Sequence, residues 1–274
     1  MIEIIYFIIL QSLFYTLFDR SPTFRFYVRT ILLFTAMAFG SLMGLLAAPL
    51  TLINKSIDVN ATATYFNGLV SKAFAGVQVD VVSGKQHLRF TRPVVYVSNH
   101  QSNLDTAVLA QVYPERTVII AKKELKSVPI LGQVLQAGNN IFLDRKVRQS
   151  AIESMNKVGN RMEKDSLSLM IYPEGTRTHQ ITNTISTFKK GAFHLATQHG
   201  FDIVPIVNAT YYPAYDENEK RFDKLIVQVK VLDPIPSAGK SVEELLKETH
   251  DKMSAALAEI QTIKAPCRKY ETLL

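Results

Sequence analysis

The densest group of polar side chains follows a short apolar segment and contains one histidine. It reads Asn-His-Gln-Ser-Asn-Leu-Asp over residues 99–105, between a β-branched run at 93–97 and an apolar run at 107–112. Ser, Asn and Asp favour the first turn of a helix, so we predict a strand-to-helix loop here. In such a loop Asp105 can fold back and hold the imidazole of His100, and a histidine held in this way acts as a general base. Taken alone, this spacing more often describes a loop histidine beside a helix-capping aspartate.

Two further clusters carry groups that bind anions. Tyr-Pro-Glu-Gly-Thr-Arg at 172–177 follows an apolar run; its Gly-Thr pair exposes backbone N–H groups, and Arg177 offers a fork of donors. The segment 138–145 begins with a glycine, contains a short apolar strand and ends in Asp-Arg, and three lysines upstream form a basic entry to the same region: Lys122, Lys123 and Lys126. Each cluster alone is equally explained as a polar turn, a surface ion pair or a solvated face.

The order of these clusters resembles that of a known enzyme family. Asn-His-x4-Asp, Gly-x6-Arg, Pro-Glu-Gly-Thr-Arg and Val-Pro-Ile follow one another between residues 99 and 206. This order is similar to that of the glycerolipid acyltransferases, specifically the 1-acyl-sn-glycerol-3-phosphate acyltransferases, and the segments 121–132, 142–145 and 188–196 are most similar to the fungal enzymes. The resemblance covers residues 65–235 and includes a hydrophobic N-terminus of the expected kind. Tyr172 stands where Phe is common and Thr178 where Ser is common, and both differences are conservative.

The resemblance implies a reaction and a role for each motif. The sn-2 hydroxyl of lysophosphatidic acid would attack the thioester of acyl-CoA directly, without an acyl-enzyme, with His100 as general base and Asp105 orienting it. Arg145 would hold the phosphate of the acceptor. The other residues implied to bind substrate or shape its pocket are Lys122, Gly138, Glu174, Gly175, Thr176, Arg177 and Pro205, the last with its neighbours Val204 and Ile206. Acyl-CoA is implied as a co-substrate, and no resident cofactor is implied.

The sequence gives little support to other catalytic chemistries. Cys267 is the only cysteine and lies outside every motif, and no Gly-x-Ser-x-Gly segment occurs. These observations argue against a covalent nucleophile and against a thiolate metal cluster. His194 and His199 are five residues apart without carboxylate partners, which predicts exposed positions on a helix over 189–200 and no metal site.

The segments around the clusters alternate in pattern along the chain. Apolar, β-branched runs predict strands at 77–82, 93–97, 117–120, 166–172, 203–207 and 225–231. Capping-box patterns at Ser150–Glu153 and Ser241–Glu244 precede apolar residues at helical spacing. Continuous apolar strands suit burial on both faces, so we predict an α/β fold with a mixed, largely buried sheet flanked by helices.

A hydrophobic N-terminus precedes this body. Residues 30–53 carry no charge and are mostly apolar, long enough for a helix to cross about 30 Å of hydrocarbon, and residues 4–18 form a shorter apolar run. A cleaved signal peptide fits less well, because the first charge is acidic and a longer apolar run follows. We therefore predict a retained helical membrane anchor, a hairpin over residues 1–55, then an acyltransferase domain over 56–264 and a C-terminal tail over 265–274.

The charge of the chain fits membrane and phosphate partners. Lys and Arg number 31 against 24 Asp and Glu, for a net charge of +7, which behind a membrane anchor indicates anionic lipid surfaces or phosphorylated substrates. No zinc-finger spacing, RNP-like motif or basic helix supports nucleic-acid binding, and nothing indicates an obligate protein partner. The predicted location is the endoplasmic reticulum membrane, with lipid droplets as the alternative.

Three functions remain open at this stage. The leading one is a membrane-bound acyltransferase that makes phosphatidic acid from lysophosphatidic acid and acyl-CoA. The second keeps this chemistry but uses lysocardiolipin, another lysophospholipid or glycerol 3-phosphate, since each presents a hydroxyl near a phosphate. The third is a non-catalytic lipid-binding or membrane-shaping protein. The pairing of His100 with Asp105 argues against the third function, because binding alone needs no oriented base.

Overall fold

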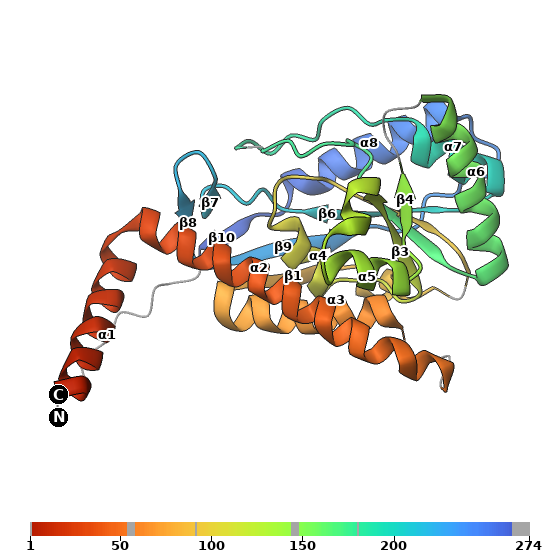
Figure 1. Ribbon diagram of the computed structural model, residues 1–274. Helices are drawn as coiled ribbons and strands as arrows, with labels where there is room; N and C mark the ends of the chain where they lie inside the picture. Colours follow the sequence, from red (N-terminus) through yellow and green to blue (C-terminus); the bar gives the residue numbers. More distant parts are fainter. Residues whose placement is uncertain (1, 54–57, 91, 144–147, 180, 265–274) are drawn as a thin grey trace.

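The fold is built around one mixed β-sheet (Figure 1). A computed structural model describes residues 2–53, 58–90, 92–143, 148–179 and 181–264. The strand order is β1-β9-β6-β2-β5-β3-β4, with β10 paired to β9, and β7 and β8 form a separate two-stranded ribbon. The strands are β1 (Val77–Ser83), β2 (Val95–Ser98), β3 (Thr117–Lys122), β4 (Ile141–Leu143), β5 (Ser168–Ile171), β6 (Ile203–Asn208), β7 (Tyr215–Asp216), β8 (Arg221–Phe222), β9 (Leu225–Val231) and β10 (Thr262–Lys264).

Five neighbouring strands run in the same direction. β6, β2, β5, β3 and β4 form parallel pairs, whereas β9 is antiparallel to β6 and parallel to β1. The carboxyl ends of these five strands therefore lie along one edge of the sheet, which we call the carboxyl edge. All six predicted strands are present, and the predicted α/β class with a mixed, buried sheet is confirmed.

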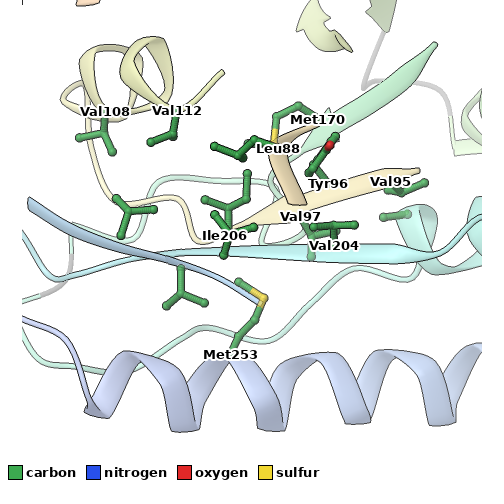
Figure 2. Close-up of a cluster of buried hydrophobic side chains, with 14 of the residues drawn as sticks. Leu88, Val95, Tyr96, Val97, Val108, Val112, Met170, Val204, Ile206 and Met253 are labelled. Carbon is green, nitrogen blue, oxygen red and sulfur yellow. The ribbon is translucent and has the colours of Figure 1, made fainter. Parts of the chain in front are cut away.

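Helices cover both faces of the sheet. One layer contains α2 (Pro22–Ala47), α3 (Val59–Val70), α4 (Asp105–Gln111) and α5 (Leu131–Ala137), and the other contains α6 (Arg148–Asp165), α7 (Gly191–His199) and α8 (Val242–Ala258). Figure 2 shows Val108 and Val112, in α4 and at its end, on one side of β2 and β6, with Met253 of α8 on the other. Because both faces are covered, strands such as β2 and β6 are buried along their whole length.

The first residues of α8 and α6 can be compared with the two capping boxes expected from the sequence. Ser241 caps α8, where its hydroxyl accepts from the backbone N–H of Glu244 while the Glu244 carboxylate accepts from the Ser241 backbone, as predicted. The helix predicted from Ser150 begins two residues earlier, at Arg148.

The N-terminal region forms two helices, α1 (Ile2–Arg20) and α2, joined at Ser21, whose hydroxyl accepts from Phe24 N–H. Within the described residues, one helical stretch, Pro22–Thr51, is apolar and long enough to cross a membrane by those two criteria. It includes the short 3₁₀ helix η1 (Ala48–Leu52) that continues α2. α1 extends away from the body (Figure 1), and its large apolar side chains between Ile4 and Leu17 are exposed.

One face of α2 packs against the body. A Cβ added at Gly40 would overlap the carbonyl oxygen of Ala63 in α3, and a Cβ at Gly44 would lie 2.8 Å from the Ala63 side chain, so the glycines allow the two helices to approach closely. Arg29 is buried, and its guanidinium donates to the carbonyl of Ala75 at 2.6 Å. α2 is therefore attached to α3 across the predicted domain boundary near residue 55, and that division stays a prediction.

We expect Gly40→Ala to destabilise the protein, although alanine in a helix is favoured over glycine by about 1 kcal/mol. The added methyl group meets backbone of α3 that cannot rotate away, and overpacking of this kind costs about 1–3 kcal/mol. Thermal unfolding in detergent measures the effect. Gly191→Ala in α7 is the control, because a Cβ there meets nothing within 4 Å. An equal unfolding temperature for the two variants would contradict close packing of α2 on α3.

Candidate active site

The carboxyl edge of the sheet brings the sequence clusters together. The His-Asp cluster follows β2, the Tyr-Pro-Glu-Gly-Thr-Arg cluster follows β5, and Lys122 is the last residue of β3. β5 lies between β2 and β3, so these three segments leave neighbouring strands in the same direction. The parallel sheet thus explains how residues distant in the chain reach one site.

His100 and Asp105 form a hydrogen-bonded pair, which we call the dyad. Asp105 is the first residue of α4, and its Oδ2 accepts from Nδ1 of His100 at 2.6 Å. The same oxygen accepts from the backbone N–H groups of Gln101 at 2.9 Å and Ser102 at 3.0 Å. The Asp105 side chain is 2% exposed, whereas that of His100 is 19% exposed. The predicted contact is therefore present, with the carboxylate buried and the imidazole reachable from solvent.

The imidazole of His100 is held in a defined orientation. The ring of Tyr172 stacks on it, with centroids 4.1 Å apart and planes 17° from parallel. The Asp105 carboxylate at Nδ1 favours the imidazole tautomer that is protonated on Nδ1. Nε2 therefore carries a lone pair. Among the described residues Nε2 has no hydrogen-bond partner, and it is therefore the atom that can take a proton from a substrate hydroxyl.

Glu174 joins two loops beneath the dyad. Its two carboxylate oxygens accept from the backbone N–H groups of His100 at 2.7 Å and Ser186 at 3.2 Å, and the residue is buried. Burial raises the pKa of Glu174, and the two backbone donors act in the opposite direction. Thr178 adds a second link, because its backbone N–H and hydroxyl both donate to the His100 carbonyl at 3.0 Å. The structure thus places Glu174 where it supports the backbone of the dyad.

The residues after Glu174 form the exposed part of this loop. Gly175 has a φ of +73°, and a Cβ there would lie 2.7–2.8 Å from the side chain of Lys189. Thr176 and Arg177 are exposed. Glycine is therefore required for the turn, while a hydroxyl and a guanidinium remain at the surface near the dyad, where they can contact an anion.

Three other predicted substrate residues lie elsewhere. Lys122 is exposed at the end of β3, on the carboxyl edge but two strands from β2. Gly138 ends α5, where a Cβ would overlap the side-chain oxygen of Asn60, so it serves the packing of α3. Pro205 is buried within β6 opposite Val97. Arg145 lies outside the described residues.

The surroundings of His199 differ from those expected from the sequence. It was expected to be exposed and without a carboxylate partner, but its side chain is 8% exposed and its Nδ1 lies 2.9 Å from the Glu163 carboxylate of α6. The ring also stacks on Phe201. The partner was missed because it is 36 residues away in the sequence and meets His199 only through the packing of α6 on α7.

Two residues of the site were not predicted from the sequence. Tyr211, beyond β6, donates its hydroxyl hydrogen to Oδ1 of Asp105 at 2.6 Å. Gln101 donates to the carbonyls of Asn208 at 3.2 Å and Ala209 at 3.0 Å and accepts from Tyr211 N–H at 3.1 Å. Gln101 is inside the predicted cluster, but nothing in its type indicated this bridge, and Tyr211 belongs to no motif. A hollow beside the dyad is lined by residues that include Gln101, Ser102, His179 and Glu217.

A solvent-reachable histidine, fixed by a buried carboxylate at the carboxyl edge of an α/β sheet, is suited to activating a hydroxyl for group transfer. Comparison with known proteins agrees with this geometry. A family model described as Acyltransferase matches residues 80–209. The 1-acyl-sn-glycerol-3-phosphate acyltransferase of Saccharomyces cerevisiae is 35% identical over 242 residues, which cover 86% of this chain and 79% of the relative.

Two further comparisons extend the result. The human 1-acyl-sn-glycerol-3-phosphate acyltransferase alpha is 34% identical over 248 residues, 88% of this chain and 87% of the relative. The crystal structure of the 1-acyl-sn-glycerophosphate (LPA) acyltransferase from Thermotoga maritima shares the fold, with a TM-score of 0.59 and 22% identity over 88% of this chain and 100% of that one. The chain belongs to the glycerolipid acyltransferase family, within its 1-acyl-sn-glycerol-3-phosphate acyltransferase group.

We expect Glu174→Ala to lower both the unfolding temperature and kcat. The change leaves two partly buried N–H groups without acceptors, at a cost of about 1 kcal/mol for each, and it releases the backbone of His100. Thermal unfolding and steady-state kinetics measure the two effects. Glu243→Ala is the control, because Glu243 pairs with Lys190 at the surface, where ion pairs contribute little. Normal stability with a raised KM for the acceptor would instead indicate direct contact of Glu174 with substrate.

Proposed function

We propose that the protein transfers a fatty acyl group from acyl-CoA to the sn-2 hydroxyl of lysophosphatidic acid and so makes phosphatidic acid. The observation that carries the proposal is the dyad, a reachable imidazole on a buried, fully hydrogen-bonded carboxylate. The relatives named above support the choice of acceptor, since their names specify 1-acyl-sn-glycerol-3-phosphate.

The reaction follows from one base. Nε2 of His100 takes the proton of the sn-2 hydroxyl while the hydroxyl oxygen attacks the thioester carbonyl. Asp105 stabilises the imidazolium that forms. The tetrahedral intermediate then collapses, the carbon–sulfur bond breaks, and the departing thiolate takes the proton from the imidazolium. Free CoA and phosphatidic acid leave, and His100 returns to its neutral form without an acyl-enzyme.

Binding of the acceptor phosphate is proposed for three basic residues. Arg177 is exposed in the loop after β5, next to the dyad, and offers a planar fork of donors. Arg145 is proposed as a second ligand on the resemblance alone. Lys122, at the end of β3 on the same edge, adds positive charge that attracts anionic substrates.

We expect His100→Ala to lower kcat by on the order of 10²–10⁴, because the hydroxyl then has no base, while lysophosphatidic acid still binds. An assay in detergent with lysophosphatidic acid and oleoyl-CoA measures the change. The matched control is His87→Ala, which removes the histidine of another His–Asp pair, with Asp233 at 2.9 Å, that shares no residue with the dyad. A near-normal kcat for His100→Ala would exclude His100 as the base. If the wild-type protein transfers acyl groups only to other lysophospholipids, lysophosphatidic acid is not the acceptor.

We also propose that the protein binds membranes through the outward face of α2 and through α1. Along α2 the buried positions include Phe26, Arg29 and Leu33, whereas the opposite face exposes large apolar side chains: Tyr27, Ile31, Phe34, Phe39, Leu42 and Leu46. The two charged side chains of α2 contact the body of the protein. Arg25 pairs with Asp223 at 3.4 Å, and Arg29 donates to the carbonyl of Ala75. An exposed apolar surface of this extent is typical of contact with lipid.

A fluorophore attached at position 42 should be quenched by lipids brominated on their acyl chains. The variant Leu42→Cys is made in a Cys267→Ser background and reconstituted into vesicles, and fluorescence is compared with and without the brominated lipid. Ile263→Cys in β10 is the control, because Ile263 and Leu42 are both 41% exposed, yet Ile263 lies on the sheet. Equal quenching at the two positions, or quenching at position 42 only by aqueous iodide, would contradict the assigned face.

A further inference from the structure

The buried carboxylate of Asp105 has two oxygens, and they have different partners. Oδ2 faces the imidazole and accepts from His100, Gln101 and Ser102. Oδ1 accepts from the hydroxyl of Tyr211 at 2.6 Å, across 106 residues of sequence. Tyr211 is 2% exposed, so water does not compete for this bond. The tyrosine hydroxyl therefore fixes the rotation of the carboxylate that holds His100.

The backbone of Tyr211 is fixed to the same loop. Its N–H donates to Oε1 of Gln101, and the amide nitrogen of Gln101 donates to two carbonyls just before it, those of Asn208 and Ala209. Asn99 adds a reciprocal pair of bonds with the backbone of Asn208 at 2.8 and 2.9 Å. The end of β6 and the loop after β2 thus form one unit, and the position of the Tyr211 ring is coupled to that of the dyad.

The hydroxyl of Tyr211 is a permanent donor. Burial first, and then the nearby Asp105 charge, raise the pKa of Tyr211 well above its usual value, so the phenol stays protonated throughout the pH range of an assay. A donor therefore always faces Oδ1 and holds the plane of the carboxylate. In the part of the chain that the structure describes, further charged or titratable groups near the dyad are Glu174, Tyr172, Arg177 and Tyr215.

We propose that Tyr211 is a positioning residue of the reaction, the third member of a His100–Asp105–Tyr211 chain. It orients the Asp105 carboxylate toward Nδ1 of His100, and so holds the imidazole in the direction that leaves Nε2 open to a substrate hydroxyl. This inference rests on the proposed function, in which His100 is the base. It assigns a role in the reaction to a side chain that lies outside every motif of the sequence.

The test is Tyr211→Phe, which removes one oxygen and keeps the ring. Without the donor the carboxylate gains charge and rotational freedom, so we expect kcat to fall by on the order of tenfold, as for loss of one charge-assisted hydrogen bond. The KM values for both substrates should change little, because Tyr211 acts through Asp105.

Three comparisons separate this role from a structural one. Tyr96→Phe is the matched control, since Tyr96 is equally buried and its hydroxyl donates to the backbone carbonyl of His87 at 3.0 Å, away from the dyad. Tyr211→3-fluorotyrosine keeps the hydroxyl donor to Asp105 and should therefore retain a near-normal kcat, in contrast to the phenylalanine variant. In an Asp105→Asn background, Tyr211→Phe should lower the residual kcat by much less than tenfold, because the partner charge is gone.

The outcomes distinguish the inference from the function on which it rests. If His100→Ala is inactive while Tyr211→Phe matches Tyr96→Phe in kcat, the role of Tyr211 is overturned and the base stands. If Tyr211→Phe lowers kcat only in proportion to lost thermal stability, or equally in the Asp105→Asn background, its role is structural and the inference is also overturned. If His100→Ala retains normal kcat, the proposed base fails, and the chain fails with it.

Discussion

A buried carboxylate is costly unless donors surround it, and the site is arranged around that requirement for Asp105. Two of its donors are backbone N–H groups of the loop that follows β2, a third is the imidazole, and the fourth comes from Tyr211 beyond β6. The loop after β5 meets the same loop through Glu174 and Thr178. Satisfying the Asp105 carboxylate therefore joins the segments that follow β2 and β6, and Glu174 and Thr178 attach the segment that follows β5. The part of the dyad left reachable is the imidazole.

The sheet makes this arrangement possible. β6, β2 and β5 are consecutive parallel strands, so the segments that follow them emerge side by side at the carboxyl edge. The helices on both faces of the sheet shield β2 and β6 from solvent. The polar groups needed for chemistry are therefore confined to the carboxyl edge. A Glu or Asp placed one strand length earlier would be buried without donors. The position of the motifs directly after strands is thus a physical consequence of the fold.

The sequence alone predicted those features that depend on a local interaction or on a repeating pattern. The His100–Asp105 contact lies within a single loop, and the six predicted strands are continuous apolar runs. It did not predict contacts that depend on the direction of a side chain or on packing between segments distant in the chain. Motif membership did not reveal that Gly138 packs against Asn60. Tyr211 and the Glu163 partner of His199 lie 106 and 36 residues from the groups they meet, and no local pattern marks such pairs.

The same reasoning applies to the N-terminus. Hydropathy alone describes α2 as a helix apolar all round, whereas its glycines and arginines show that one face belongs to the body. α2 also contacts α5, and α5 is joined through η4 (Lys123–Ser127) to the end of β3 on the carboxyl edge. A lipid surface on the outward face of α2 would therefore be held at a fixed distance from the dyad. Because α2 packs closely on α3, the acceptor of the proposed reaction could keep its acyl chain in the bilayer while its headgroup reaches His100, which a freely hinged anchor would not ensure.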